Sequence, residues 1–195
     1  ARLKLPIHLV GLIASAENMP GSNATRPGDI VKSLSGKTME ILNTDAEGRV
    51  VLADALYYAQ RYNPDAIIDF ATLTGAIMIA LGQHATGLMA TDQALAEKIK
   101  AAGEKSGERV WQLPMWPEYR EMVKSDVADV KNTAGRAGGS ITAAAFLAAF
   151  VGDFPFAHLD IAATAWMENP IKAYHHKGAT GVGVRMMVEL LKEYR

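Results

Sequence analysis

The sequence contains no cysteine, few aromatic residues and almost no net charge. The absence of cysteine excludes disulfide bonds and thiolate metal ligands, and it fits a reducing cytosol, so we expect a cytoplasmic protein. Lys and Arg together number 20 and Asp and Glu number 21, which gives a net charge of −1. This balance argues against a nucleic-acid-binding protein that relies on phosphate contacts and against a polybasic membrane anchor.

Long hydrophobic runs are also missing. The longest unbroken apolar stretch, Ala143–Val151, is far shorter than the roughly 20 residues that a membrane-spanning helix needs. The first residues lack the anatomy of a signal peptide and do not include an initiator Met. Hydrophobic residues nevertheless make up 49% of the chain, which is enough to bury a core. We expect residues 1–195 to fold as one domain, or as the C-terminal part of one.

Apolar stretches of strand length alternate with segments of helical period. Such alternation predicts an α/β fold with a central, largely parallel or mixed sheet and helices on both faces, in three layers. Turn signals such as Ser35-Gly36 and Asn63-Pro64 separate the elements. The predicted strands are residues 7–15, 30–34, 38–42, 66–73, 86–90, 110–113 and 156–163, and the predicted helices are residues 49–62, 76–81, 92–105, 117–124, 140–151 and 184–194.

The densest polar motif, NTDAEGR at Asn43–Arg49, lies between a predicted strand and a predicted helix. Ligands of open α/β sheets gather where strands end and helices begin. Asp45 and Glu47 offer two hard oxygen ligands of the kind that Mg, Mn or Zn accepts, and a carboxylate can bridge two ions. Arg49 adds a permanent planar cation suited to a carboxylate-like anion. This motif is therefore the strongest candidate site.

A structural interpretation of the same motif competes with the metal interpretation. Thr44-x-x-Glu47 has the spacing of a capping box, and acidic residues in the first turn of a helix are stabilised by its dipole. Two carboxylates also do not complete a metal site. From the residues alone, the capping box is the favoured alternative.

The motif and several further blocks resemble the leucyl aminopeptidase (cytosol aminopeptidase) family of metallopeptidases. The seven-residue signature Asn43–Arg49 is specific, and the other blocks follow it or precede it in the order of the family. The resemblance covers essentially the whole chain and implies a fold like that of zinc peptidases. The matching blocks are Leu12–Pro20, Pro27–Asp29, Ser35–Thr38, Leu52–Leu56, Asp69–Ala76 and Lys177–Gly181.

The resemblance implies a role for each matching residue. Asp45 would bind one of two divalent metal ions, Zn or Mn, through its carboxylate and its main-chain carbonyl, and Glu47 would bridge both ions. Arg49 would hold a bicarbonate-like anion that acts as the general base. The substrate-binding residues would be Asn43, Thr72, Leu73, with its main-chain carbonyl, and Gly75.

The family also implies the reaction and the assembly. It hydrolyses N-terminal, leucine-like residues from peptide substrates, and it suggests a homo-hexamer. Its remaining metal ligands and its catalytic Lys lie upstream, in segments resembling GKGxxFDTGG and MKxDMxGA, and neither segment occurs here. No role is transferred to Lys4, Lys32 or Lys37. We therefore expect this chain to be a C-terminal part of the catalytic domain, inactive by itself.

Two other functions remain open at this point. The chain could belong to a catalytically inactive structural or interaction protein with the same fold, or to a two-metal hydrolase of another acyl bond. Three buried-strand residues receive structural interpretations: Asp69 as a hydrogen-bonding partner of the backbone, and His158 and Asp160 as a satisfied structural pair on one face of a strand.

Overall fold

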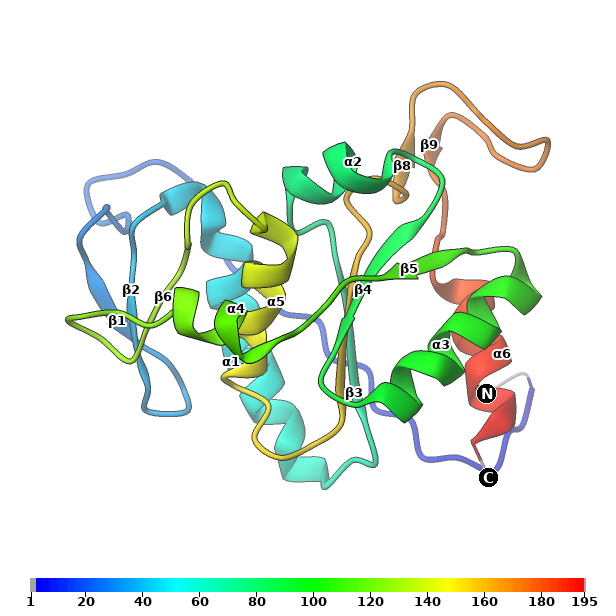
Figure 1. The fold of residues 1–195 in the computed structure, drawn as a ribbon, viewed down its shortest axis with the longest axis horizontal. Coiled ribbons are helices and arrows are strands. Elements are labelled where there is room, and N and C mark those ends of the chain that lie inside the picture. The colour runs from blue at the N-terminus through cyan, green and yellow to red at the C-terminus, as the bar shows by residue number, and fades with distance from the viewer. Residues whose placement is uncertain (1–2, 195) are drawn as a thin grey trace. The chain divides into compact units, whose positions relative to one another are not determined.

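The computed structural model describes residues 3–194 and divides them into two compact units. One unit, which we call the sheet unit, contains the residues up to Gly11, Ile68–Leu113 and those from Ala157 on. The other, which we call the hairpin unit, contains Leu12–Ile67 and Pro114–Phe156. Each unit is thus assembled from segments that are far apart in the sequence (Figure 1).

The hairpin unit is built around a three-stranded sheet. Strands β1 (Ile30–Lys32) and β2 (Thr38–Glu40) are antiparallel, with Val31 opposite Met39. Gly36 has a φ of +88°, a conformation that glycine adopts without strain, so it closes the turn between them. Strand β6 (Val130–Lys131) adds to β2 in parallel. The predicted hairpin is confirmed, whereas the two-residue strand β6 was not predicted.

The helices of the hairpin unit follow the predicted segments closely. The 3₁₀ turn η1 (Thr44–Ala46) leads into α1 (Glu47–Ala59), which ends in a second 3₁₀ turn, η2 (Gln60–Tyr62). Helix α4 (Pro117–Met122) begins at a proline, as predicted. Helix α5 (Gly139–Ala148) packs against α1 and α4 and is buried from Ser140 to Leu147. Its nearly uniform apolar surface therefore forms the core of this unit.

The sheet unit contains a four-stranded mixed sheet in the order β3-β7-β4-β5. The strands are β3 (Ile67–Ala71), β7 (Phe156–Asp160), β4 (Thr86–Ala90) and β5 (Val110–Gln112). Strand β4 runs antiparallel to β7 and parallel to β5. Every residue of β7 is buried. A separate pair, β8 (Trp166–Met167) and β9 (Gly178–Ala179), is antiparallel and lies outside the predicted strands.

Three helices complete the sheet unit. Helix α2 (Gly75–Leu81) and helix α3 (Gln93–Ser106) contact β4, and α3 packs along helix α6 (Val184–Glu193) (Figure 1). The side chain of Asp92 accepts a hydrogen bond from the Leu95 amide and caps α3 at the start of the predicted helix. Strands and helices alternate along the chain, so the predicted α/β class with a mixed sheet is confirmed.

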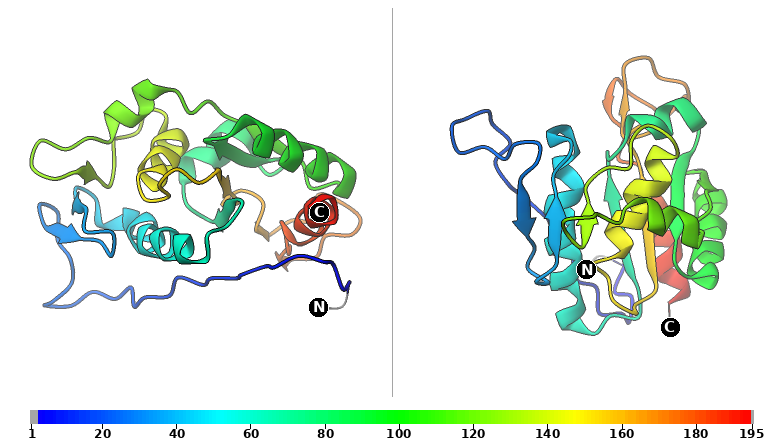
Figure 2. Two further views of the ribbon diagram at one scale, coloured as in Figure 1. Left: turned by 90° about the horizontal axis from the view of Figure 1, so that it is seen from below. Right: turned by 60° about the vertical axis from the view of Figure 1, so that its left-hand side comes forward.

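One expectation about the elements is wrong. Residues 7–15 were predicted to form a strand, but residues 3–29 contain no helix or strand (Figure 2). A strand needs a neighbour to pair with, and no described strand pairs with this segment, so Ile13 is 92% exposed. Helix α2 forms where expected and buries one face, since Ile77 is buried while Ile79 is 89% exposed. Within residues 3–194, no helix has the length and hydrophobicity to cross a membrane.

Candidate functional site

The signature segment Asn43–Arg49 joins the end of β2 to the start of α1. The side chain of Asn43 accepts a hydrogen bond of 3.0 Å from the Asp45 amide, so Asn43 is the N-cap of η1. The short 3₁₀ turn places Asp45 and Glu47 on either side of the buried Ala46. Both carboxylates therefore project from the junction between a strand and a helix, where the sequence placed them.

The structure contradicts the capping box as the explanation for these acids. The N-cap of α1 is Ala46, which makes no side-chain capping hydrogen bond, and the cap of η1 is Asn43 rather than Thr44. Asp45 is exposed and Glu47 is half-buried. Among the hydrogen bonds and ion pairs of residues 3–194, none uses either carboxylate. Their oxygen atoms are thus available to a cation.

Arg49 is held within the first turns of α1. The residue is only 8% exposed, and its Nη1 donates a hydrogen bond of 2.9 Å to the carbonyl oxygen of Asn132. A buried guanidinium needs partners for its donors, and this carbonyl is one of them. This contact anchors the guanidinium of Arg49, which follows Asp45 and Glu47 in the same short segment.

Asn132 belongs to the second stretch of sequence in this unit, Pro114–Phe156, and contacts the same segment. It was not identified from the sequence. It follows β6, is completely buried, and its side chain hydrogen-bonds the backbone of Asn43. A single Asn carries no signal that its partners lie about 90 residues upstream. Only the parallel pairing of β2 with β6 brings the two positions together.

The second group of predicted residues, Thr72, Leu73 and Gly75, lies between β3 and α2 in the sheet unit. Thr72 and Gly75 are exposed and Leu73 is half-buried. The structure therefore places Asn43, Asp45, Glu47 and Arg49 in the hairpin unit, and it places the other three substrate-binding candidates, Thr72, Leu73 and Gly75, in the sheet unit.

A buried carboxylate shapes this second segment. Asp160, fully buried at the end of β7, accepts hydrogen bonds from the amides of Leu73 at 3.2 Å and Thr74 at 3.4 Å, and from the Thr74 hydroxyl at 2.6 Å. The Thr74 hydroxyl in turn accepts from the Ile77 amide and caps α2. The turn that carries Leu73 is thus fixed by Asp160.

Asp69 and His158 pair with each other rather than as the sequence suggested. The Nδ1 atom of His158 lies 2.9 Å from Oδ2 of Asp69, so the partner of Asp69 is a side chain and not the backbone that the sequence suggested. The predicted pairing of His158 with Asp160 is wrong: His158 Nδ1 pairs with Asp69, and Asp160 accepts hydrogen bonds from the Leu73–Thr74 turn.

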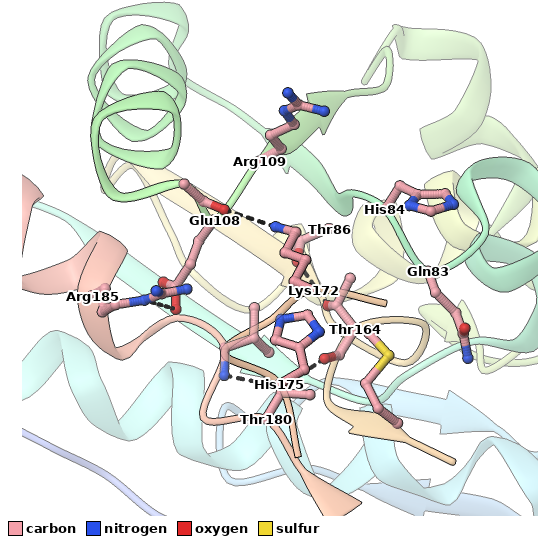
Figure 3. A pocket seen from close by; sticks show the side chains of 13 residues that line it. Gln83, His84, Thr86, Glu108, Arg109, Thr164, Lys172, His175, Thr180 and Arg185 are labelled. Carbon is pink, nitrogen blue, oxygen red and sulfur yellow. Dashed lines mark hydrogen bonds and ion pairs between the residues drawn. The ribbon is translucent and has the colours of Figure 1, made fainter. Parts of the chain in front are cut away.

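The sheet unit also contains a small polar cavity of about 30 Å³ (Figure 3). Several of its lining groups bind one another: Glu108 accepts from Arg185, the Lys172 ammonium donates to the carbonyl of Gly107, and the hydroxyls of Thr86 and Thr164 share a hydrogen bond of 2.8 Å. In the described part of the chain, none of the predicted site residues lines it.

His175 is the exception within this cavity. Its Nδ1 is buried without a hydrogen-bond partner among the described residues. Burial, followed by the charges of Lys172 and Arg185, lowers the pKa of the imidazole. The cavity has room for an ordered water that would satisfy this atom, so we interpret it as a structural polar cluster.

The sequence as a whole matches a known family. The profile of the Peptidase_M17 family, described as "Cytosol aminopeptidase family, catalytic domain", matches residues 1–188. The chain belongs to this family. The resemblance seen in the signature and in the surrounding blocks is thereby confirmed.

Other proteins of the cytosol aminopeptidase family are close to this chain in sequence. A protein of Roseiflexus castenholzii named "Probable cytosol aminopeptidase" is 66% identical over 194 residues, which is 100% of this chain and 40% of that protein. A protein of the same name from Geobacter sulfurreducens is 58% identical over 98% of this chain and 38% of that protein. The chain therefore spans about 40% of the length of these relatives.

Solved structures of the family confirm the fold. A mutant of tomato leucine aminopeptidase superposes with a TM-score of 0.84 at 46% identity, over 91% of this chain and 34% of that one. The bottromycin maturation enzyme BotP in complex with Mn gives a TM-score of 0.85 at 45% identity, over 91% and 40% of the two chains. The α/β fold with its mixed sheets is that of the leucine aminopeptidase catalytic domain.

The donor set of the signature segment fits divalent metal ions but does not complete a site for them. Carboxylate oxygens suit Mn and are also used by Zn. Asp45 and Glu47 are free to provide them. No group of three or more His, Cys, Asp or Glu residues within residues 3–194 could hold an ion without further ligands.

Proposed function

We propose that this chain forms part of the two-metal catalytic site of an aminopeptidase that hydrolyses N-terminal, leucine-like residues from peptides. One observation carries the proposal: in a member of the cytosol aminopeptidase family, Asp45 and Glu47 project from a strand-to-helix junction with no structural partner among the described residues. Apart from their place in the first turn of a helix, the two carboxylates have no partner in the described fold, so their oxygen atoms can coordinate a cation.

Asp45 and Glu47 would hold two divalent ions, Zn or Mn. In this proposal Asp45 binds one ion through its carboxylate and its main-chain carbonyl, and Glu47 bridges both. The ions, when bound, lower the pKa of the attacking water and polarise the scissile carbonyl. The chain contributes the rigid η1–α1 junction, which presents the two acids at a spacing of two residues.

Arg49 would bind a bicarbonate-like anion that accepts the proton of the attacking water. A guanidinium is always protonated, and its planar fork matches the two oxygens of such an anion. One of its amino groups is already anchored at the carbonyl of Asn132, which leaves the orientation of the fork defined. Arg49 itself therefore orients the base and transfers no proton.

The segment Thr72–Gly75 would line the substrate. The main-chain carbonyl of Leu73 can accept a hydrogen bond from the peptide, and the exposed Thr72 and Gly75 can contact it. Asn43 is a further contact in this proposal. The hydrogen bonds that this turn donates to Asp160 hold it fixed before substrate arrives. Preorganised contacts cost little ordering entropy on binding.

The proposal extends to the state of the whole protein. We expect a cytoplasmic protein, in keeping with relatives that carry the name cytosol aminopeptidase, and we expect it to assemble as a homo-hexamer. Light scattering of the full-length protein tests the assembly, and a monomeric mass would contradict it.

One observation favours the alternative, an inactive structural protein, for the chain by itself. The described residues contain two available carboxylates and no group of three or more metal-ligating side chains, so the isolated segment should neither bind two ions tightly nor hydrolyse peptides. Stoichiometric binding of two ions by the segment alone would show that this ligand count is wrong.

The activity is tested in the full-length protein that we expect to contain this chain. The wild type should release leucine from leucyl peptides and should leave N-blocked peptides intact, which separates an aminopeptidase from a hydrolase of other acyl bonds. Glu47→Ala should lose nearly all activity because the bridging ligand is gone. Near-normal turnover by this variant would defeat the assignment.

A further inference from the structure

Asn132 is a buried residue whose side-chain hydrogen bonds lie within Leu42–Ala46, at the start of the segment that carries the candidate metal ligands. It follows β6, and its own amide donates to the carbonyl oxygen of Glu40 at 2.9 Å, so it extends the parallel ladder between β2 and β6 by one residue. Its exposure is 0%. The residue is therefore anchored on the sheet before its side chain makes any contact.

The side chain of Asn132 binds both N–H donors and carbonyl acceptors of the Leu42–Ala46 backbone. Its Oδ1 accepts from the amides of Leu42 at 2.9 Å and Asn43 at 3.2 Å. Its Nδ2 donates to the carbonyl of Asn43 at 2.7 Å and lies 3.5 Å from that of Ala46. Only an amide side chain offers an acceptor and a two-proton donor at this spacing.

The main chain of Asn132 fixes the other end of the same segment. Its carbonyl accepts the hydrogen bond from Arg49. One residue thus holds the backbone before Asp45 and a side chain after Glu47. Because neither carboxylate is itself tied to the described part of the protein, the position of both depends on the backbone between these two anchors.

We propose that Asn132 is a positioning residue for the metal ligands: it holds the Leu42–Ala46 backbone and Arg49 so that Asp45 and Glu47 are preorganised for divalent cations. This inference rests on the proposed function, since it concerns the same site. Partners that orient ligands in this way are typically worth about 10- to 100-fold in metal affinity.

The decisive variant is Asn132→Asp, which keeps the shape and the Oδ1 acceptor but removes the donor. It would place a carboxylate oxygen against the Asn43 carbonyl, which lies 2.7 Å from Nδ2. Gln60→Glu is the matched control, because the Gln60 amide also donates at 2.7 Å to a backbone carbonyl, that of Phe150, in the same unit but outside the signature segment.

The experiment titrates Mn²⁺ into metal-free full-length protein by calorimetry, with thermal unfolding measured in parallel. We expect Asn132→Asp to weaken Mn²⁺ binding by about 10-fold or more, and Gln60→Glu to leave it unchanged even where the two variants lose similar thermal stability. Unchanged affinity in Asn132→Asp, or an equal loss in both variants, overturns the inference. If the wild type binds no Mn²⁺, the proposed function fails, and the positioning of metal ligands falls with it.

A second measurement needs no variant and separates the two failures. Leu42 is 43% exposed and lies outside any helix or strand, so its amide proton would exchange rapidly if Asn132 did not hold it. Hydrogen exchange of the wild type should show slow exchange at Leu42 and Asn43. Fast exchange at both amides contradicts the clamp whether or not the protein binds metal or cleaves peptides.

Discussion

Asp69 and His158 face each other from the neighbouring strands β3 and β7, with 2.9 Å between Oδ2 and Nδ1. The imidazole is fully buried, and the carboxylate side chain is only 9% exposed. An ionised carboxylate can only accept, so Nδ1 carries the proton and donates it. The pair ties together the two strands that end at the segment Thr72–Gly75 and at Asp160.

Removal of the Asp69 carboxylate should destabilise the protein. Asp69→Ala is expected to lower the free energy of unfolding by about 1–3 kcal/mol because a buried donor loses its acceptor. Asp69→Asn should cost less, since its amide oxygen still accepts from Nδ1. Urea unfolding measures both, with the exposed Asp65→Ala as a control. Equal stability of Asp69→Ala and the control would show that the pair is not structural.

The approach of α2 to β4 depends on a glycine. A Cβ at position 87 would lie 2.4 Å from Cδ1 and 2.8 Å from Cγ1 of the buried Ile77. Gly87→Ala should therefore destabilise the protein by about 1–3 kcal/mol and displace α2, which begins at Gly75. Ile77→Val removes the closest of these atoms, so the double variant should be less destabilised than the sum of the two single variants.

The control for this cycle is Gly21→Ala, because a Cβ there meets nothing within 4 Å. It should stay within about 0.5 kcal/mol of the wild type. Strictly additive effects of Gly87→Ala and Ile77→Val would mean that the close contact does not limit the packing of α2.

Asp160 should be critical for the turn that contains Leu73. Asp160→Ala leaves the amides of Leu73 and Thr74 without their acceptor and is expected to cost at least about 2 kcal/mol of folding free energy. Asp160→Asn keeps one oxygen and should be milder. In the full-length protein the milder variant should raise KM for leucyl peptides, since the turn that would line the substrate loosens. An unchanged KM with a looser turn would remove Thr72–Gly75 from the substrate site.

Much of the fold could be predicted from local sequence patterns. Helix α5 is apolar on every side and is buried as expected, and Ser35-Gly36 closes a hairpin because its glycine accepts a positive φ. The signature Asn43–Arg49 lies at the junction where its residues were placed. These features depend on neighbours within a few positions, which the sequence displays directly.

The remaining features depend on partners far away in the chain. The strand predicted at residues 7–15 is absent, because no strand among the described residues pairs with this segment. An apolar run in the sequence does not show whether such a neighbour exists. Asn132 and Asp160 could not be selected, since their partners lie 86 to 90 positions away. The capping box was favoured because its spacing is local, but the observed cap is Asn43.

The helix pair α3 and α6 provides a test of pH dependence. The Lys105 ammonium, followed by that of Lys192, lowers the pKa of the Glu189 carboxyl below its usual 4.5. A carboxyl whose pKa is lower in the folded state stabilises the fold above its unfolded pKa, and this contribution is lost as the pH falls through the folded pKa. Lys105→Met should therefore raise the pKa of Glu189 towards 4.5 and weaken the loss of stability in acid.

Carbon-13 NMR of the Glu189 carboxyl measures this shift. Lys100→Met is the matched control, because Lys100 lies in the same helix but pairs with Glu97. It should raise the pKa of Glu97 and leave that of Glu189 unchanged. A Glu189 titration that ignores the loss of Lys105 would mean that the ion pair does not persist in solution.

The central claim is that Asp45 and Glu47 serve metal ions rather than the fold, and Mn²⁺ stoichiometry in the full-length protein tests it most directly. The wild type should bind two Mn²⁺ ions per chain. Glu47→Gln should lose at least one of them while its free energy of unfolding without metal changes by no more than about 1 kcal/mol, the value of a first-turn carboxylate on a helix dipole. Two tightly bound ions in Glu47→Gln, or none in the wild type, would contradict the account.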